Sequence, residues 1–181
     1  MNTIVKNTLI SCLPVFLVAC SSEDNPTKPN EVVSGSQTNL VINEFMADND
    51  NINIDPDFEQ FSDWIEIYNM GDGTVDMSGM YLTDDLSEPT KWQIPAPTTL
   101  ESRKFLIFWA DNEDVVDSAL HTNFKLGASG EEIGLYASDG DTPIDTLSFS
   151  EQNTDISYGR FPDGSNTWKT FDIPTQGASN N

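Results

Sequence analysis

The chain has 181 residues and a formal net charge of −22, because thirty acidic residues outnumber eight basic ones. That length fits one domain with a short additional segment, and the negative charge opposes binding to nucleic acids and other polyanions. Both cysteines, Cys12 and Cys20, lie in the first twenty residues, so a folded region further along must depend on hydrophobic burial and not on a disulfide.

The N-terminal residues predict export and lipidation. Lys6 precedes an apolar run over residues 9–19, which is shorter than the roughly 20 apolar residues of a membrane-spanning helix. The tetrapeptide Leu17-Val18-Ala19-Cys20 resembles the lipobox of bacterial lipoproteins, in which the cysteine is acylated and becomes the first mature residue. We expect a signal peptide over residues 1–19 and a stable lipid anchor at Cys20. The alternative is an ordinary secretory peptide with a chance cysteine.

Residues 20–39 are expected to be a flexible tether behind the anchor. They contain Pro26 and Pro29 among Ser, Thr and Asn residues, and no apolar period that could pack. The acidic pair Glu23-Asp24 resembles the surface-export signals of some Gram-negative lipoproteins, although such residues also serve simply as solvated charges. We therefore expect an outer-membrane lipoprotein, with display at the cell surface as a hypothesis.

From Leu40 onward, short apolar runs alternate with turn residues and no helical period occurs, which predicts an all-β domain over residues 40–181. The predicted strands are 40–47, 62–69, 74–77, 80–83, 91–94, 104–110, 122–126, 132–137, 144–149, 156–161 and 168–171. Asp-Gly pairs at Asp72-Gly73, Asp139-Gly140 and Asp163-Gly164 predict tight turns between antiparallel neighbours, since Gly supplies the positive φ that such turns need.

Two of these strands carry a clear burial pattern. In the run from Ser62 to Asn69, Ile65 and Ile67 share one face, which we expect to be buried, while Trp64, Glu66 and Tyr68 share an amphipathic face. The run from Phe105 to Ala110 is apolar on both faces, which predicts the most buried strand, covered on both sides.

An ordered set of motifs resembles the lamin tail domain family, in its bacterial branch, from Leu40 to Asn180. The resemblance implies an immunoglobulin-like antiparallel β-sandwich. The motifs are Val41-Ile42-Asn43-Glu44-Phe45-Met46, Ser62 to Asn69, Asp76 to Asp84, Pro89-Thr90-Lys91-Trp92, Phe108-Trp109-Ala110-Asp111, Leu120 to Leu126, Gly130 to Tyr136, Ser157 to Gly164 and Pro174 to Asn180.

No catalytic residue is expected. His121 is the single histidine, and no Gly-x-Ser-x-Gly sequence accompanies it, so a serine triad is not indicated and His121 is expected to pack or to form hydrogen bonds. With thirty acidic residues some carboxylates must lie close together. A glycosidase would need two of them at a fixed separation in a cleft.

The acidic loop that leads into Asp63 is the candidate metal site. Dense oxygen ligands suit Ca²⁺, although the spacing is not that of an EF-hand. The candidate ligands are Asp48, Asp50, Asp55, Asp57 and Asp63. Glu44 and Glu66 would complete the site if their strands are neighbours, and the alternative is a polar connecting loop rich in turn-forming Asp and Asn.

These features predict a non-enzymatic binding module, attached to the membrane by its lipid and contacting an envelope protein or an extracellular polymer. The alternative is a carboxylate- or metal-dependent extracellular hydrolase, or an accessory domain of one. Relatives of the family accompany extracellular nucleases, but the basic residues are few and spread along the chain, so nucleic acid is not an expected partner.

Overall fold

The computed structural model describes residues 33–34, 39–115 and 119–181. The predicted signal peptide, Cys20 and most of the predicted tether lie outside these residues. The described residues form thirteen strands and no helix, so the all-β prediction is confirmed. Consistently, no helix within them is long and apolar enough to cross a membrane. The strands are β1 Val33–Ser34, β2 Leu40–Met46, β3 Asp63–Asn69, β4 Val75–Asp76, β5 Tyr81–Thr83, β6 Trp92–Gln93, β7 Thr99–Leu100, β8 Phe105–Ala110, β9 Leu120–His121, β10 Gly130–Tyr136, β11 Pro143–Ser150, β12 Ser157–Arg160 and β13 Trp168–Phe171.

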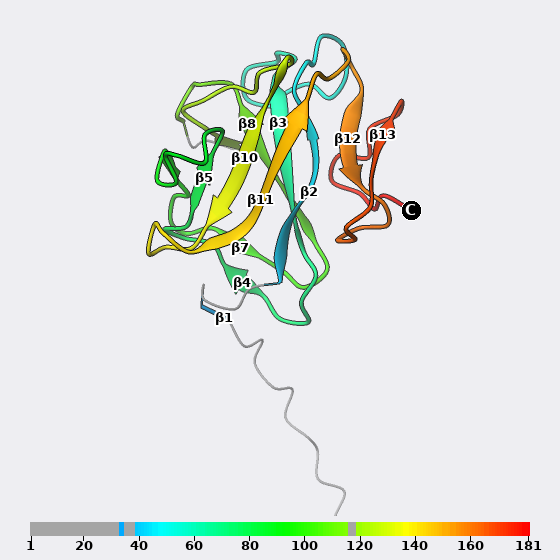
Figure 1. Cartoon of the computed structure of the whole chain (residues 1–181). Coiled ribbons are helices and arrows are strands. Elements are labelled where there is room, and N and C mark those ends of the chain that lie inside the picture. Colours follow the sequence, from blue (N-terminus) through cyan, green and yellow to red (C-terminus); the bar gives the residue numbers. More distant parts are fainter. Residues whose placement is uncertain (1–32, 35–38, 116–118) are drawn as a thin grey trace, which may run out of the picture.

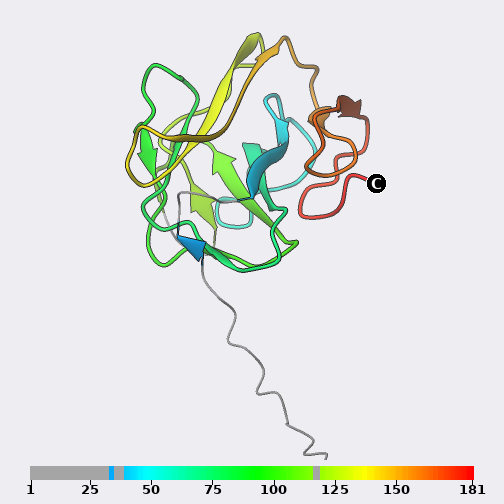
Figure 2. The ribbon, with the colours of Figure 1, turned by 60° about the horizontal axis from the view of Figure 1, so that its bottom comes forward.

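The strands form two main sheets and a small third one. The larger sheet has the order β13-β12-β2-β3-β8-β9, and the smaller has the order β11-β10-β5-β6. The third sheet, in the order β1-β4-β7, lies at one end of the molecule (Figure 1). When this end is turned forward, the strand pair β10–β11 forms a layer separate from β2 and β3, as expected for a sandwich (Figure 2).

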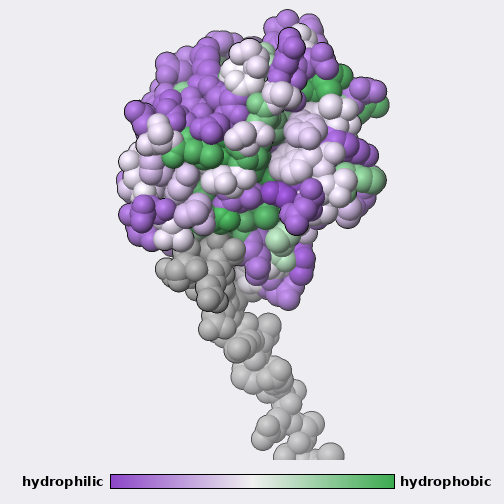
Figure 3. Space-filling model, in the orientation of Figure 1, coloured by the Kyte–Doolittle hydropathy of each residue, from purple (hydrophilic) through white to green (hydrophobic). Residues whose placement is uncertain are grey.

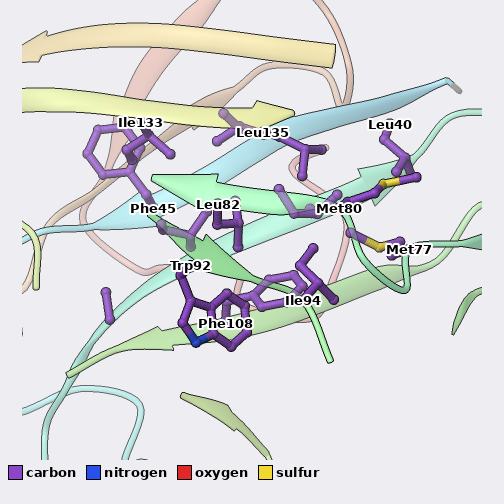
Figure 4. Packing of buried hydrophobic residues seen from close by; sticks show 14 of the residues in the cluster. Leu40, Phe45, Met77, Met80, Leu82, Trp92, Ile94, Phe108, Ile133 and Leu135 are labelled. Atoms are coloured by element: carbon purple, nitrogen blue, oxygen red, sulfur yellow. The ribbon is translucent and has the colours of Figure 1, made fainter. Parts of the chain in front are cut away.

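A single large core fills the space between the two main sheets. Phe45, Ile65 and Ile67 from the six-stranded sheet belong to the same buried cluster as Ile133 and Leu135 of β10, and Figure 4 shows side chains from both layers meeting there. Each such side chain contributes about 1.5–3 kcal/mol when fully buried. The predicted inward face of β3 is therefore confirmed.

The opposite face of β3 is also buried, which the sequence did not predict. Trp64 and Glu66 have no exposed surface, although they lie on the outer side of the six-stranded sheet. Trp64 packs in a second cluster with Met46 and Trp109. The expected amphipathic face is wrong for these two residues, because side chains of the neighbouring strands β2 and β8 pack on Trp64 and the end of the chain contacts Glu66.

The predicted burial of β8 is wrong in its first half. Phe108, Trp109 and Ala110 are buried, but Phe105, Leu106 and Ile107 are only partly buried. β2 and β3 each contain more fully buried positions than β8 does. An apolar groove lined in part by Ile107 leaves the outer face of β8 partly open. Leu106, on the inner face, packs against the core but is only partly buried.

Two of the three Asp-Gly pairs form the predicted turns. Gly140 (φ 74°) lies between the antiparallel strands β10 and β11, and Gly164 (φ 68°) lies between β12 and β13. The prediction is wrong at Asp72-Gly73, because the next strand, β4, joins a different sheet from β3.

The predicted strand over residues 122–126 is replaced by a turn. The hydroxyl of Thr122 donates to the carbonyl of Phe124 at 2.9 Å, a local bond of the kind that competes with a regular strand ladder. Only a single bridge between Asp111 and Lys125 remains. The strand forms earlier instead, as β9, which pairs with β8 in parallel and places His121 opposite Trp109.

Arg160 attaches the C-terminal hairpin to the middle of the sheet. Its Nε donates to the carbonyl of Ile42 at 2.8 Å, and its Nη2 forms an ion pair with Asp145 at 2.8 Å. Asp145 also accepts a hydrogen bond from the Ile42 amide. These contacts pair the backbone groups of Ile42 beside the irregularity in the β2–β3 register, where the ladder leaves them without their regular partners.

Candidate functional site

The single histidine lies at the centre of a buried group of carboxylates. His121 has no exposed surface. Its Nδ1 lies 2.7 Å from Asp111 Oδ2, and its Nε2 lies 3.1 Å from Asp57 Oδ2. Asp55 Oδ2 lies 3.7 Å from Nδ1. The predicted hydrogen-bonding role of His121 is thus confirmed, and it involves carboxylates from two separate segments.

Three segments of the fold bring these groups together. Asp55 and Asp57 belong to the acidic loop between β2 and β3, Asp111 follows β8 directly, and His121 ends β9. Within the loop, the Asp55 amide donates to the carbonyl of Gln60 at 2.8 Å, and the Asp55 carbonyl accepts from the Glu59 amide at 3.0 Å. These bonds close a tight turn that directs Asp55 inward.

Opposing effects set the protonation of His121. Burial by itself lowers its pKa, since a charged ring loses solvation. The hydrogen bonds to Asp111 and Asp57, and the nearby charge of Asp55, outweigh that effect and leave the pKa raised. Both ring nitrogens lie within hydrogen-bond distance of a carboxylate, and a doubly protonated ring would donate to both. Phe58 covers one side of the ring, with centroids 4.9 Å apart.

The five carboxylates predicted as calcium ligands do not all meet in one place. Asp55 and Asp57 lie beside His121, as described. Asp48 accepts a hydrogen bond from the Thr154 hydroxyl, and Asp63 accepts one from the Asn49 amide at 3.1 Å. Asp50 is exposed. The candidate ligands predicted from the sequence did not include Asp111 or His121, which lie more than fifty residues further along the chain than Asp55.

Asp63 borders a small cavity beside this group. The cavity has a volume of about 120 Å³, and its lining includes Asp63, Asp111, Glu113 and Lys125. Burial raises the pKa of Asp63 to about 7, with the charge of Asp48 adding to the effect, against the hydrogen bond from Asn49. A carboxyl group that titrates near neutrality at a cavity is a feature of functional sites, although structural networks also produce it.

A second acidic group lies further along the same sheet. Glu44 and Glu66 face each other across β2 and β3, so their strands are neighbours, which was the condition for these two residues to join the calcium site. Glu44 accepts hydrogen bonds from Ser157 and Thr175, while Glu66 accepts from Asn43 and from the Gly177 amide. The last ten residues, 172–181, which we call the C-terminal segment, thus provide part of their cover.

Burial dominates the electrostatics of this second group. It raises the pKa of Glu66 to about 8, with smaller contributions from the charges of Glu44 and Asp163, while hydrogen bonds from Asn43 and Gly177 act in the opposite direction. Glu66 is consequently protonated at neutral pH. The Glu66 side chain has no exposed surface and is enclosed by other residues of the protein, including Asn43 and Gly177.

An apolar groove lies on the outer side of the six-stranded sheet. Its volume is about 420 Å³. It is lined by Ile54, Pro56, Leu106, Ile107, Trp109, Ala119, Leu120 and Gln176. Ile54 is 55 % exposed there, so part of the groove wall faces solvent.

A comparison with protein families identifies the family whose members share this fold. The lamin tail domain model matches residues 34–151, which is more than half of the chain. The chain belongs to the lamin tail domain family. This family is a non-catalytic, immunoglobulin-like domain of the interaction type. A search of curated proteins gives no significant match.

The family match ends before the last two strands of this lamin tail domain. The resemblance deduced from the sequence runs to Asn180, whereas the matched region stops at residue 151. β12 and β13 nevertheless belong to the six-stranded sheet, where β12 pairs with β2. The C-terminal hairpin and segment therefore complete the domain structurally, beyond the matched region.

The two carboxyl groups with the most clearly raised pKa cannot act together in this lamin tail domain. Asp63 and Glu66 are three residues apart on β3, and side chains an odd number of positions apart point to opposite faces of a sheet. Asp63 borders the small cavity, whereas Glu66 is enclosed beneath the C-terminal segment. The acid-and-base pair that a glycosidase needs is not formed by these two residues.

Proposed function

We propose that the protein is a bacterial outer-membrane lipoprotein whose lamin tail domain is a non-enzymatic binding module for an envelope protein or an extracellular polymer. The observation that carries the anchoring half is the sequence Leu17-Val18-Ala19-Cys20, a lipobox-like motif placed before a folded all-β domain. The twelve residues between Cys20 and β1, which pairs with β4 of the domain, would reach at most about 45 Å. The domain would contact partners near the membrane surface.

The position of the raised-pKa carboxyls supports the non-enzymatic half. Asp63 and Glu66 lie on opposite faces of β3. They therefore cannot form the convergent pair of carboxyl groups that the alternative, a carboxylate-dependent hydrolase, would need. Family membership adds to this, since the lamin tail domain is non-catalytic. Recognition by such a module depends on surfaces and loops held by a rigid sandwich.

Replacement of the two cysteines tests the anchor. Cells expressing the full chain, its C20S variant or its C12S variant are grown with radiolabelled palmitate and then fractionated. The wild type and C12S should carry the label and sediment with outer membranes, whereas C20S should be unlabelled, because its hydroxyl cannot form the thioether. Equal labelling of C20S would contradict the proposal, and so would an unlabelled wild type. Protease treatment of intact cells then reports surface display.

Cross-linking on intact cells tests the binding role. The full chain should give discrete adducts that mass spectrometry assigns to an envelope protein or a polysaccharide. The same purified protein should leave envelope polysaccharides and peptides intact. Hydrolysis that disappears in a D63N variant, while a D139N variant at an exposed turn retains it, would favour the hydrolase alternative.

A further inference from the structure

The buried group around His121 has the arrangement of a metal site. One ligand atom from each of Asp55, Asp111 and His121 lies within 4.8 Å of the other two. All three residues are buried, with Asp55 and His121 at 0 % exposure and Asp111 at 8 %. They come from three segments that are far apart in the sequence, so the sandwich itself fixes their positions.

A buried oxygen without a hydrogen-bond donor points to a missing ligand. Asp55 Oδ2 is buried and accepts no hydrogen bond from any residue that the structure describes. A buried carboxylate oxygen without a partner is costly. It faces Nδ1 of His121 from 3.7 Å, a separation too long for a hydrogen bond. A cation between the two groups would satisfy it.

The remaining oxygens of both carboxylates are already held. Asp55 Oδ1 accepts the Asp57 amide at 2.9 Å, and Asp111 Oδ1 accepts the Glu113 amide at 3.1 Å. Each carboxylate is thereby oriented by a backbone amide, and its Oδ2 faces the imidazole of His121. Such orientation of ligands by hydrogen bonds is typical of metal centres.

We propose that Asp55, Asp111 and His121 bind one divalent transition-metal ion of the zinc class, through the two Oδ2 atoms and the histidine Nδ1. The ion displaces the Nδ1 proton, which leaves to solvent, and the ring keeps its Nε2 proton. That proton is donated to Asp57, 3.1 Å away. This is the carboxylate–histidine–metal arrangement, in which the outer carboxylate fixes the tautomer and the ring orientation.

The two distances from His121 Nδ1 fit this ion with little movement. Zinc bonds of about 2.0–2.2 Å at tetrahedral angles separate two ligand atoms by roughly 3.3–3.5 Å. The present separations from Nδ1 are 2.7 Å to Asp111 and 3.7 Å to Asp55, on either side of that value. Two carboxylates, a neutral imidazole and a dication also sum to zero charge, which suits a buried site.

The composition of the site selects the class of metal. Ca²⁺ takes six to eight oxygen ligands, whereas this group offers two carboxylates and one imidazole nitrogen, a set that borderline ions such as Zn²⁺ accept. Asp111 also borders the cavity of about 120 Å³, so the group lies beside a space large enough for water.

Metal binding by the purified full chain, prepared without a histidine tag, tests the proposal directly. After chelator treatment and dialysis, the chain should bind one equivalent of ZnCl₂, and its melting temperature should rise. X-ray absorption at the zinc edge should show one imidazole and oxygen ligands at about 2.0–2.2 Å. Because the chain has a single histidine, that imidazole can only be His121. This measurement on the wild type does not depend on any variant folding.

Variants then assign the ligands. D55N, D111N and H121Q should each weaken zinc binding more than 100-fold, and D57N by about 10- to 100-fold. D50N, at an exposed carboxylate of the same loop, is the matched control and should bind as the wild type does. Far-UV circular dichroism checks that each variant keeps its β structure.

Several results would overturn the proposal. They are the absence of stoichiometric zinc binding, a zinc spectrum with sulfur at about 2.3 Å or without imidazole, or equal losses in D50N and D55N. A melting temperature that rises with CaCl₂ but not with ZnCl₂, and loses that response in D48N and D50N, would instead support an all-oxygen site in the loop.

Discussion

Glu66 shows how a buried carboxylate is tolerated in this sheet. It has no exposed surface, and both of its oxygens accept hydrogen bonds, one from Asn43 Nδ2 at 3.0 Å and one from the Gly177 amide at 2.6 Å. The charged neighbours are acidic, namely Glu44 and Asp163. With solvent removed and only negative charges nearby, the neutral form is favoured despite the two donors.

This balance predicts a pH-dependent stability with a definite sign. The pKa of Glu66 rises from 4.5 to about 8 on folding, so between these values the folded state holds a proton that the unfolded state has released. The free energy of unfolding should therefore fall as pH rises from 4.5 to 8, by about 1.4 kcal/mol per pH unit from this group. Urea denaturation from pH 5 to pH 8.5 measures it.

A Glu66→Gln variant isolates this contribution. Gln cannot ionise, so the stability of the wild type relative to the variant should fall steadily up to pH 8 and then become constant. A constant offset of about 1–3 kcal/mol is expected in addition, because the amide nitrogen meets a donor where the carboxyl accepted. E151Q, at an exposed position, is the control. An unchanged pH slope in E66Q would show that Glu66 is ionised in the folded state.

Gly159 is required by close approach and not by an unusual φ. A Cβ at this position would lie 2.9 Å from Asn180 Nδ2, 3.0 Å from Glu44 Cγ and 3.1 Å from the Asn43 carbonyl. G159A should therefore lower the free energy of unfolding by about 1–3 kcal/mol. At Gly127 the nearest atom would be 3.5 Å away, an ordinary contact, so G127A should be neutral. Similar effects of the two substitutions in thermal denaturation would contradict this assignment.

At the scale of elements, the C-terminal segment is part of the sheet's cover. Thr175 and Gly177 bind Glu44 and Glu66 through backbone amides. Near the end of the segment, Asn180 has no exposed surface. The side-chain Nδ2 of Asn180 donates to the Arg160 carbonyl at 2.9 Å, and its backbone amide donates to Asp163 Oδ1 at 2.9 Å. The C-terminal segment is thus held at Thr175 and Gly177, which contact the acidic pair, and again at Asn180.

The two terminal asparagines give a matched test of this cover. N180A removes the hydrogen bond to a buried carbonyl and should cost about 1–3 kcal/mol of stability, with faster amide hydrogen exchange at Thr175 and Gly177. N181A changes an exposed residue and should have no measurable effect. If N180A leaves both stability and exchange unchanged, the segment does not hold the sheet in solution.

The sequence predicted most strands because their signals are local. Alternation in β3 and the Asp-Gly turns at Gly140 and Gly164 are decided by neighbouring residues. The burial of Trp64 and Glu66 was not predictable in this way, because the residues that cover them come from elsewhere in the chain. β9 was also missed: two residues are too few to show a period, and its pairing with β8 depends on the return of the chain to that edge.

The site around His121 was predicted only in part for the same reason: some of its contacts depend on residues far apart in the sequence. Composition identified the acidic loop that contains Asp55 and Asp57, since dense carboxylates are visible in the sequence. Which of them turn inward depends on the turn closed by Gln60 and Glu59. The parallel pairing of β8 with β9 brings His121 to Asp111, and that pairing has no sequence signature of its own. A single histidine near acidic residues is an ambiguous signal until the topology is known.

At the scale of the whole molecule, repulsion between acidic residues opposes folding. Hydrophilic residues dominate the face seen in Figure 3, with small apolar patches between them. Among the described residues, ion pairs with Lys or Arg are few: Lys91 with Asp84, Arg103 with Asp72, and Arg160 with Asp145. Three pairs cannot offset a formal net charge of −22, particularly since an exposed pair such as Arg103 with Asp72 contributes little.

This imbalance predicts that salt stabilises the protein. Raising NaCl from about 0.1 M to about 1 M shortens the screening length from about 10 Å to about 3 Å, which weakens long-range repulsion more than the contact pairs. The free energy of unfolding in urea should rise by about 1 kcal/mol, the scale of a few exposed charge interactions. A double variant, E151K with D172K, changes two exposed acidic residues and should show a smaller rise, because less repulsion remains to be screened. If salt instead lowers the stability of the wild type, the ion pairs of Arg160 and Lys91 outweigh the net charge. An equal rise in the two proteins would indicate a general effect of salt on apolar burial.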